Sequence, residues 1–147
     1  MKKSILIVYD ELKILIPLQF LLERHGYNVM TAQTGDHALE LIYQNNPDLV
    51  LLGIKLSGID GHEICETISI HPEYRNIKII VLTAGGSDVE IAKGIALGVD
   101  AYITKPFMEG ELVTKVKALL AKNIKNPWHT QSVTLSNCVI IDSNIIL

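Results

Sequence analysis

The chain has 147 residues, of which 48% are apolar, and its formal net charge is −3. This length and apolar content suffice for one buried core, so we expect a single compact domain. The charge balance excludes a basic surface for non-specific binding of nucleic acid.

The sequence lacks the patterns of a signal peptide and of a membrane span. The first apolar run, Ile5-Leu6-Ile7-Val8, is too short for the apolar region of a signal peptide, and no run approaches the roughly 18 residues of a membrane span. Cys65 and Cys138 lie far apart without metal-type spacing. We therefore expect a cytoplasmic protein in which Cys65 packs as a small apolar side chain, with a disulfide or a reactive thiol as the alternative.

Short apolar runs alternate with amphipathic stretches along the chain, as strands and helices do in α/β proteins. In chain order, strands are expected at residues 4–9, 28–32, 49–52, 78–82 and 101–103. Helices are expected between and after them, at residues 14–25, 35–45, 61–70, 87–97 and 109–122.

Pro17 falls within the first helical pattern, where proline removes a backbone donor and costs about 3 kcal/mol in a helix interior. The helix either begins late, near Lys13 or Ile14, or is kinked. We favour the late start, because the first amides of a helix have no partner within the helix.

Three of the strand runs, residues 5–8, 49–52 and 79–82, are apolar throughout and do not alternate. Such strands must be covered on both faces, which is typical of parallel sheets. Five βα units of this kind predict an α/β fold with an open, doubly wound, five-stranded parallel sheet and helices on both faces. Binding sites in this architecture form beyond the carboxyl ends of the strands.

The residues that follow those strand ends predict a phosphate site. Asp10 and Glu11 follow the first strand, Thr83 the fourth and Lys105 the fifth. Carboxylates suit a divalent cation, and a lysine with a hydroxyl can hold phosphate oxygens. Each residue also has an ordinary interpretation: the acids can begin a helix, the threonine suits a strand, and the lysine can be a solvated surface residue.

The motifs at these strand ends resemble those of response-regulator receiver domains, over roughly residues 3–122. The resemblance rests on four segments: residues 5–11, 47–53 with Ser57-Gly58-Ile59-Asp60-Gly61, 81–84, and 98–107. It implies a flavodoxin-like strand order of 2-1-3-4-5. It also implies a two-component signalling module, not an enzyme, that takes a phosphoryl group from a histidine kinase onto an aspartate.

The resemblance assigns a role to each candidate residue. Position 53 would be the phospho-acceptor, and Asp10 would hold Mg²⁺. Lys105 would pair with the acceptor and then with the phosphate, and Thr83 would bind a phosphate oxygen. Tyr102 would be the aromatic residue that turns inward on activation, and Lys105-Pro106 resembles a bond that is cis in the family. Protein partners, and a homodimer, would use the fourth helix, the fifth strand and the fifth helix.

Two departures from the family pattern fall in the site itself. Gly53 has no carboxylate, so an acyl phosphate cannot form at that position. Tyr9 replaces the first of two paired acids, which leaves Asp10 and Glu11 as the acidic remnant. We therefore expect weak or absent Mg²⁺ binding and no other cofactor. We also expect Tyr9 to fill the space left at position 53, with its hydroxyl near Lys105 or Asp10.

The receiver domain is expected to span residues 1–122, followed by a polar linker at 123–132 and a tail at 133–147 that reads as two short strands. The tail is similar to the opening strands of a winged-helix effector domain; the alternative is a segment that packs on the receiver or pairs between chains. Neither interpretation predicts nucleic-acid or membrane binding by this chain alone.

Three functions follow from these observations. The first is a receiver that no longer accepts phosphate and acts as a phosphorylation-independent binding domain. The second is a conventional phosphorelay receiver, from a DNA-binding regulator, whose acceptor is substituted in this chain. The third, a small phosphate-ester enzyme using Asp10, Thr83 and Lys105, is the least favoured because it lacks a nucleophile and paired acids.

Overall fold

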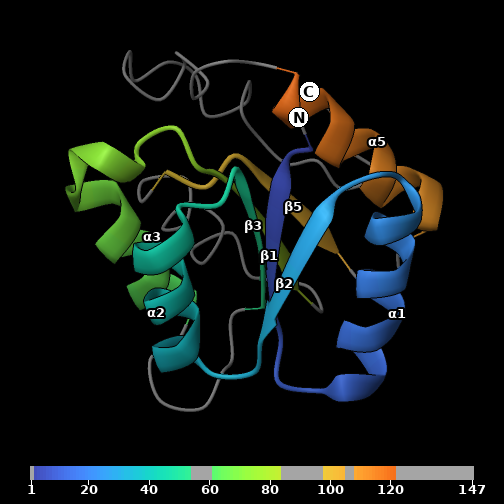
Figure 1. The fold of residues 1–147 in the computed structure, drawn as a ribbon, viewed down its shortest axis with the longest axis horizontal. Helices are drawn as coiled ribbons and strands as arrows, with labels where there is room; N and C mark the ends of the chain where they lie inside the picture. The colour runs from blue at the N-terminus through green and yellow to red at the C-terminus, as the bar shows by residue number, and fades with distance from the viewer. Residues whose placement is uncertain (1, 54–60, 84–97, 105–107, 122–147) are drawn as a thin grey trace.

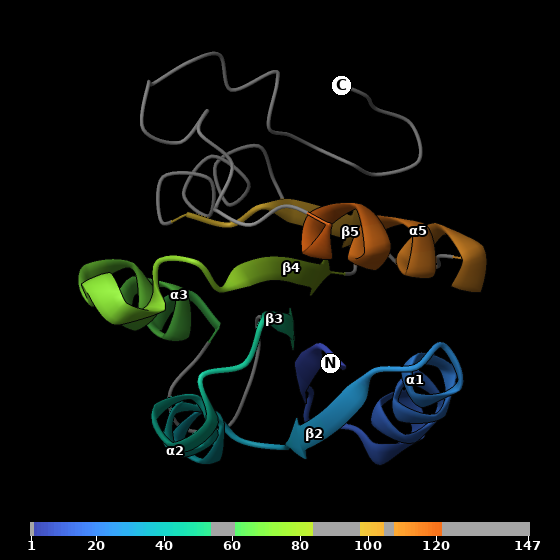
Figure 2. The ribbon, with the colours of Figure 1, turned by 45° about the horizontal axis from the view of Figure 1, so that its top comes forward.

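A computed structural model of the chain describes residues 2–53, 61–83, 98–104 and 108–121. Five strands form one parallel sheet in the order β2-β1-β3-β4-β5, which confirms the predicted fold and strand order (Figures 1 and 2). The strands are β1 (Ser4–Val8), β2 (Asn28–Ala32), β3 (Leu49–Gly53), β4 (Lys78–Thr83) and β5 (Ala101–Thr104).

Helices cover both faces of the sheet. They are α1 (Leu12–Arg24), α2 (Gly35–Asn45), α3 (Gly61–Ile70) and α5 (Glu109–Leu120), with a short 3-10 helix at Pro72–Tyr74. Helices α1 and α5 lie on one face, and α2 and α3 on the other (Figure 1). The helix expected at residues 87–97, the linker and the tail lie outside the described residues.

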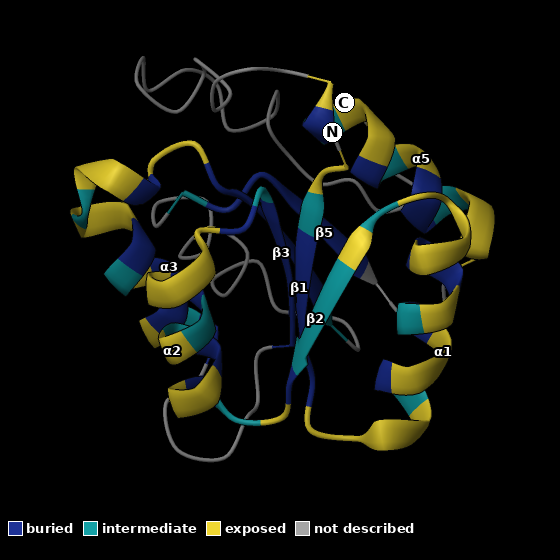
Figure 3. Ribbon diagram, in the orientation of Figure 1, coloured by how far each residue is buried: buried dark blue, intermediate teal, exposed yellow. Residues whose placement is uncertain are grey.

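The core has two layers because successive strand residues point to opposite faces of the sheet. Leu6, Val8, Val50 and Leu52 pack toward α2 and α3, while Ile5, Ile7, Leu49 and Leu51 pack toward α1 and α5. All eight residues are buried, and Figure 3 shows β3 and most of β1 in the colour of buried residues. The uninterrupted apolar runs of β1 and β3 are therefore explained by burial on both faces.

The expected late start of the first helix was wrong. Helix α1 begins at Leu12, and the carbonyl of Glu11 accepts hydrogen bonds from the amides of Ile14 (3.1 Å) and Leu15 (3.0 Å). Pro17 consequently lies inside the helix, in its second turn. The carbonyl that loses a donor belongs to Lys13, four residues earlier, and both Lys13 and Pro17 are exposed to water. Solvent can therefore replace the missing hydrogen bond.

Candidate functional site

Four strand ends meet at the carboxyl edge of the sheet, where the site was predicted. Val8 pairs in register with Leu52, so Tyr9 and Gly53 are level with each other in adjacent segments. Gly53 pairs with Leu82 on its other side, and Thr83 pairs with Thr104. The parallel register thus brings together residues that lie tens of positions apart in the sequence.

The ring of Tyr9 occupies the space into which a side chain at position 53 would project. A Cβ atom built on Gly53 would stand 2.8 Å from Cδ1 and 3.0 Å from Cε1 of Tyr9, and 3.5 Å from the carbonyl oxygen of Val8. Carbon atoms in optimal contact are 3.5–4.0 Å apart. Even a methyl group at position 53 therefore requires the ring to move.

Tyr9 is a buried residue, with 8% of its surface exposed, and its ring belongs to the core layer beneath α1 and α5. Its backbone amide donates to the carbonyl of Ala32 (3.1 Å), so the strand pairing with β2 extends to this residue. These observations confirm the expectation that Tyr9 fills the space at position 53. Lys105, one expected partner of its hydroxyl, lies outside the described residues.

The two remaining acids lie at the start of α1 and are exposed. Glu11 is the residue preceding the first turn, and its side chain makes no capping hydrogen bond. The backbone carbonyl of Asp10 accepts a hydrogen bond from Nε2 of Gln33 (3.3 Å), which connects this loop to the end of β2. Glu11 therefore lies at the start of a helix, which is the alternative to metal binding that its position in the sequence allowed.

These acids do not form the oxygen-rich cluster that a magnesium site requires. Tyr9 and Gly53, which lie beside each other at this edge of the sheet, supply no carboxylate. Within the described part of the chain, no three His, Cys, Asp or Glu side chains are grouped so that they could hold a metal ion. The described residues at this edge of the sheet therefore do not fit the Mg²⁺ that the family resemblance implies.

Thr83 and Tyr102 lie on the adjacent strands. Thr83 ends β4 and is half-buried. Tyr102 is in β5 opposite Val81, and only 2% of its surface is exposed. Its side chain belongs to the core layer beneath α2 and α3. Lys105 and Pro106 fall outside the described residues.

At the amino ends of the strands, opposite the predicted site, two carboxylates accept hydrogen bonds from strand amides. The sequence did not reveal these roles. Oδ2 of Asp48 accepts a hydrogen bond from the amide of Ser4 (2.8 Å), and Oδ2 of the buried Asp100 accepts one from the amide of Ile79 (2.8 Å). Both bonds fix the start of a central strand. The signal available in the sequence was their position, directly before a strand.

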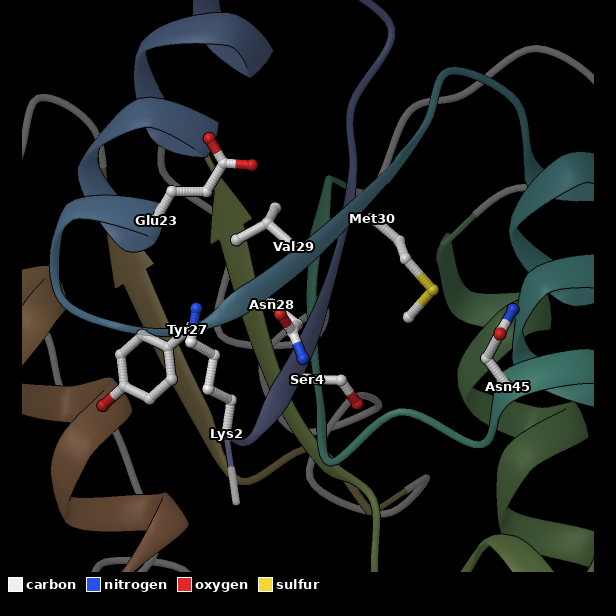
Figure 4. Close-up of a pocket in the computed structure, with 8 residues that line it drawn as sticks. All are labelled: Lys2, Ser4, Glu23, Tyr27, Asn28, Val29, Met30 and Asn45. Atoms are coloured by element: carbon white, nitrogen blue, oxygen red, sulfur yellow. The ribbon is translucent and has the colours of Figure 1, made fainter.

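A surface pocket of about 500 Å³ lies beside β2, near the amino ends of the strands (Figure 4). Tyr27 lines it, and burial raises the pKa of the Tyr27 phenol. The other lining residues are Lys2, Ser4, Glu23, Asn28, Val29, Met30 and Asn45. The pocket includes neither Tyr9 nor Gly53, so it is separate from the predicted site.

The family model for the response regulator receiver domain matches residues 5–117. The chain belongs to this family. A response regulator from Chloroflexus aurantiacus shares 36% sequence identity with the receiver, with a TM-score of 0.78 over 83% of this chain and 100% of that one.

Two further solved structures are similar to the receiver. The receiver domain of a signal transduction histidine kinase from Syntrophus aciditrophicus is 29% identical, with a TM-score of 0.75 over 81% of this chain and 90% of that one. The BeF3-activated receiver domain of RstA from Klebsiella pneumoniae is 28% identical, with a TM-score of 0.75 over 82% and 100%. No helix among the residues with described structure has the length and apolarity needed to span a membrane.

Proposed function

We propose that this receiver domain has lost phosphorylation on aspartate and serves two-component signalling as a phosphorylation-independent binding domain. The observation that carries the proposal is the Tyr9 ring, which occupies the place of the acceptor side chain beside Gly53. Because position 53 offers no nucleophilic oxygen, a phosphoryl group has no atom to bind there.

The buried position of Tyr102 supports the same proposal. In the family resemblance this aromatic residue turns inward on activation, and here it lies in the core with 2% of its surface exposed. An inward aromatic residue without a phosphate would give the receiver one fixed surface for its partners. We propose that a histidine kinase or a downstream effector binds that surface, through the fourth helix, β5 and α5.

Incubation with a small-molecule phosphodonor and Mg²⁺, followed by intact-mass measurement, tests this function. We expect no increase in mass, because the described residues at these strand ends offer neither an acceptor carboxylate at position 53 nor a cluster of acids for the metal. A base-labile increase of one phosphoryl group on the wild-type chain would overturn the proposal.

The matched positive control is the double variant Tyr9→Asp with Gly53→Asp, which restores both missing carboxylates and removes the ring that blocks position 53. Uptake of phosphate by this variant would show that the rest of the site is intact. That outcome would trace the expected failure of the wild type to take up phosphate to positions 9 and 53. Gly53→Asp alone should take up less phosphate, because its Cβ meets the Tyr9 ring at 2.8 Å.

A further inference from the structure

Strand β2 forms one edge of the sheet, and within the described residues only β1 pairs with it (Figure 2). The amide of Asn28 donates to the carbonyl of Lys3 (3.0 Å), so the backbone groups of Asn28 point toward β1. Successive residues of a strand bond to opposite sides. The amides and carbonyls of Val29 and Thr31 therefore point away from β1, where they can pair with a further strand.

The residues of β2 do not protect this edge against pairing. Edge strands are commonly blocked by a charged side chain, a proline or a bulge. Strand β2 (Asn28–Ala32) contains no charged residue and no proline, and its pairing with β1 runs through all five residues without a break in register. This strand is thus suited to accept another strand along its outer side.

The pocket beside β2 opens around this edge (Figure 4). Its lining residues Tyr27 and Val29 lie on the α1 side of the sheet, and Met30 lies on the α2 side. Glu23 of α1 and Asn45 of α2 complete it on the two sides. A strand added to a sheet edge projects alternate side chains to the two faces. The pocket therefore offers room for side chains of an added strand on both faces.

The tail at residues 133–147, which lies outside the described residues, contains the sequence pattern of such a strand. Four of the five odd-numbered residues from 133 to 141 are apolar, namely Val133, Leu135, Val139 and Ile141. Thr134 and Ser136 lie between them. This period of two predicts a strand with one covered face and one face toward water.

The linker is long enough for the tail to reach β2 of its own chain. Helix α5 ends at Leu120, and Leu119 packs on the same core layer as Tyr27, which directly precedes β2. The linker at residues 123–132 spans up to roughly 33 Å when extended. A domain of this size has a radius of gyration of about 14 Å. The tail can thus pass from the end of α5 to the outer side of β2.

We infer that residues 133–141 pair with β2 of the same chain as a sixth strand of the sheet. Because the linker holds the tail at a local concentration on the order of millimolar, a weak contact suffices. The added strand would leave β5, at the other edge of the sheet, accessible to the partners proposed above. This inference does not depend on the loss of phosphorylation.

Amide hydrogen exchange of the full chain, followed residue by residue by NMR, tests the pairing. The amides of Val29 and Thr31 should exchange about tenfold more slowly, or slower still, in the wild type than in Leu135→Pro, because proline cannot pair within a strand. Asn126→Pro, in the linker, is the matched control and should exchange as the wild type does.

Two outcomes of the exchange measurement would overturn the inference. Equal exchange in the wild type and in Leu135→Pro would show that the tail leaves β2 uncovered, as expected of a tail that belongs to an effector domain. Protection of Val29 and Thr31 that is lost on tenfold dilution would show that the tail of a second copy covers the strand.

A spin label locates the tail independently. Cys65 has 1% of its surface exposed, so a nitroxide reagent should label Cys138 in the tail selectively. The label should broaden the amide signals of Val29 and Met30 in β2 and leave that of Ile103 in β5 sharp. Leu135→Pro should abolish the broadening. Broadening of β5, or none in β2, would contradict the proposed position.

Discussion

At the scale of single residues, Tyr9 and Gly53 form a matched pair. Because Gly53 has no side chain, the Tyr9 ring can lie against the backbone at the end of β3. The ring in turn fills the space that the missing side chain would leave. Neither residue can be understood without the other, because the register of β1 and β3 places them level with each other.

A double-mutant cycle measures this coupling. Gly53→Ala should destabilise the wild type by about 1–3 kcal/mol, because an added methyl group overpacks a filled site. In a Tyr9→Ala background the same change should cost less than about 0.5 kcal/mol, since the ring is gone. Urea unfolding of the four proteins gives the values. Additivity within about 0.5 kcal/mol would show that the two residues do not compete for space.

The sequence predicted which residues come together, because strand topology determines that. It did not predict the distances between them, because those depend on side-chain packing. The convergence of Tyr9, Gly53 and Thr83 follows from the parallel order of the strands, which the apolar runs had indicated. The inward position of Tyr9 was predicted from the volume missing at Gly53. The distances between ring and backbone depend on side-chain packing, which no sequence pattern encodes. The expected roles of Lys105 and Pro106 remain predictions.

At the scale of helices, local capping signals explain which boundaries were predictable. Helix α2 begins and ends where expected. Oγ1 of Thr34 accepts a hydrogen bond from the amide of His37 (3.2 Å), and Asn46 ends the helix in the left-handed conformation, with a φ angle of 44°. Such residues are recognisable in a sequence because their side chains act within one turn.

Helix α1 was mispredicted at its start because tertiary packing outweighs a local cost. Four leucines, at positions 15, 18, 21 and 22, are buried against the sheet. Their burial contributes roughly 1.5–3 kcal/mol each. The four together contribute roughly 6–12 kcal/mol, which exceeds the roughly 3 kcal/mol that Pro17 costs in a helix interior. The helix therefore forms through the proline.

Pro17→Ala should accordingly stabilise the domain. We expect a gain of about 1–2 kcal/mol: the helix regains a hydrogen bond to the carbonyl of Lys13, and part of that gain is offset because the unfolded chain becomes more flexible. Urea unfolding at low protein concentration measures the change, with Glu40→Ala on the exposed side of α2 as a control that should differ little from wild type. Lower stability of Pro17→Ala would mean that the proline makes a favourable contact.

At the scale of the whole molecule, the prediction agrees with the strand order and the two-sided covering of the sheet in the described residues. Apolar runs without alternation indicated parallel strands covered on both faces, and the core has those two layers. The resemblance supplied the strand order that the structure confirms. The exposed apolar side chains of Leu12, Ile16 and Phe20 on α1 were not predicted, because the pattern of buried leucines describes the opposite side of the helix.

The receiver as a whole should be insensitive to Mg²⁺. A ligand raises stability only if it binds the folded state, and the described residues offer no cluster of acids for the ion. We expect the thermal midpoint to be unchanged at 10 mM Mg²⁺, whereas the double variant Tyr9→Asp with Gly53→Asp should gain stability. Differential scanning calorimetry measures both proteins. A rise of several degrees in the wild type would contradict this expectation.

The contact between Tyr9 and Gly53 also makes the outcome of a change at either position depend on the other. An aspartate at position 53 alone would collide with the ring, and an acid at position 9 alone would leave a hollow beside the glycine. Each single substitution is therefore expected to give a less stable protein. Two carboxylates can be accommodated at this edge of the sheet only when both positions change together.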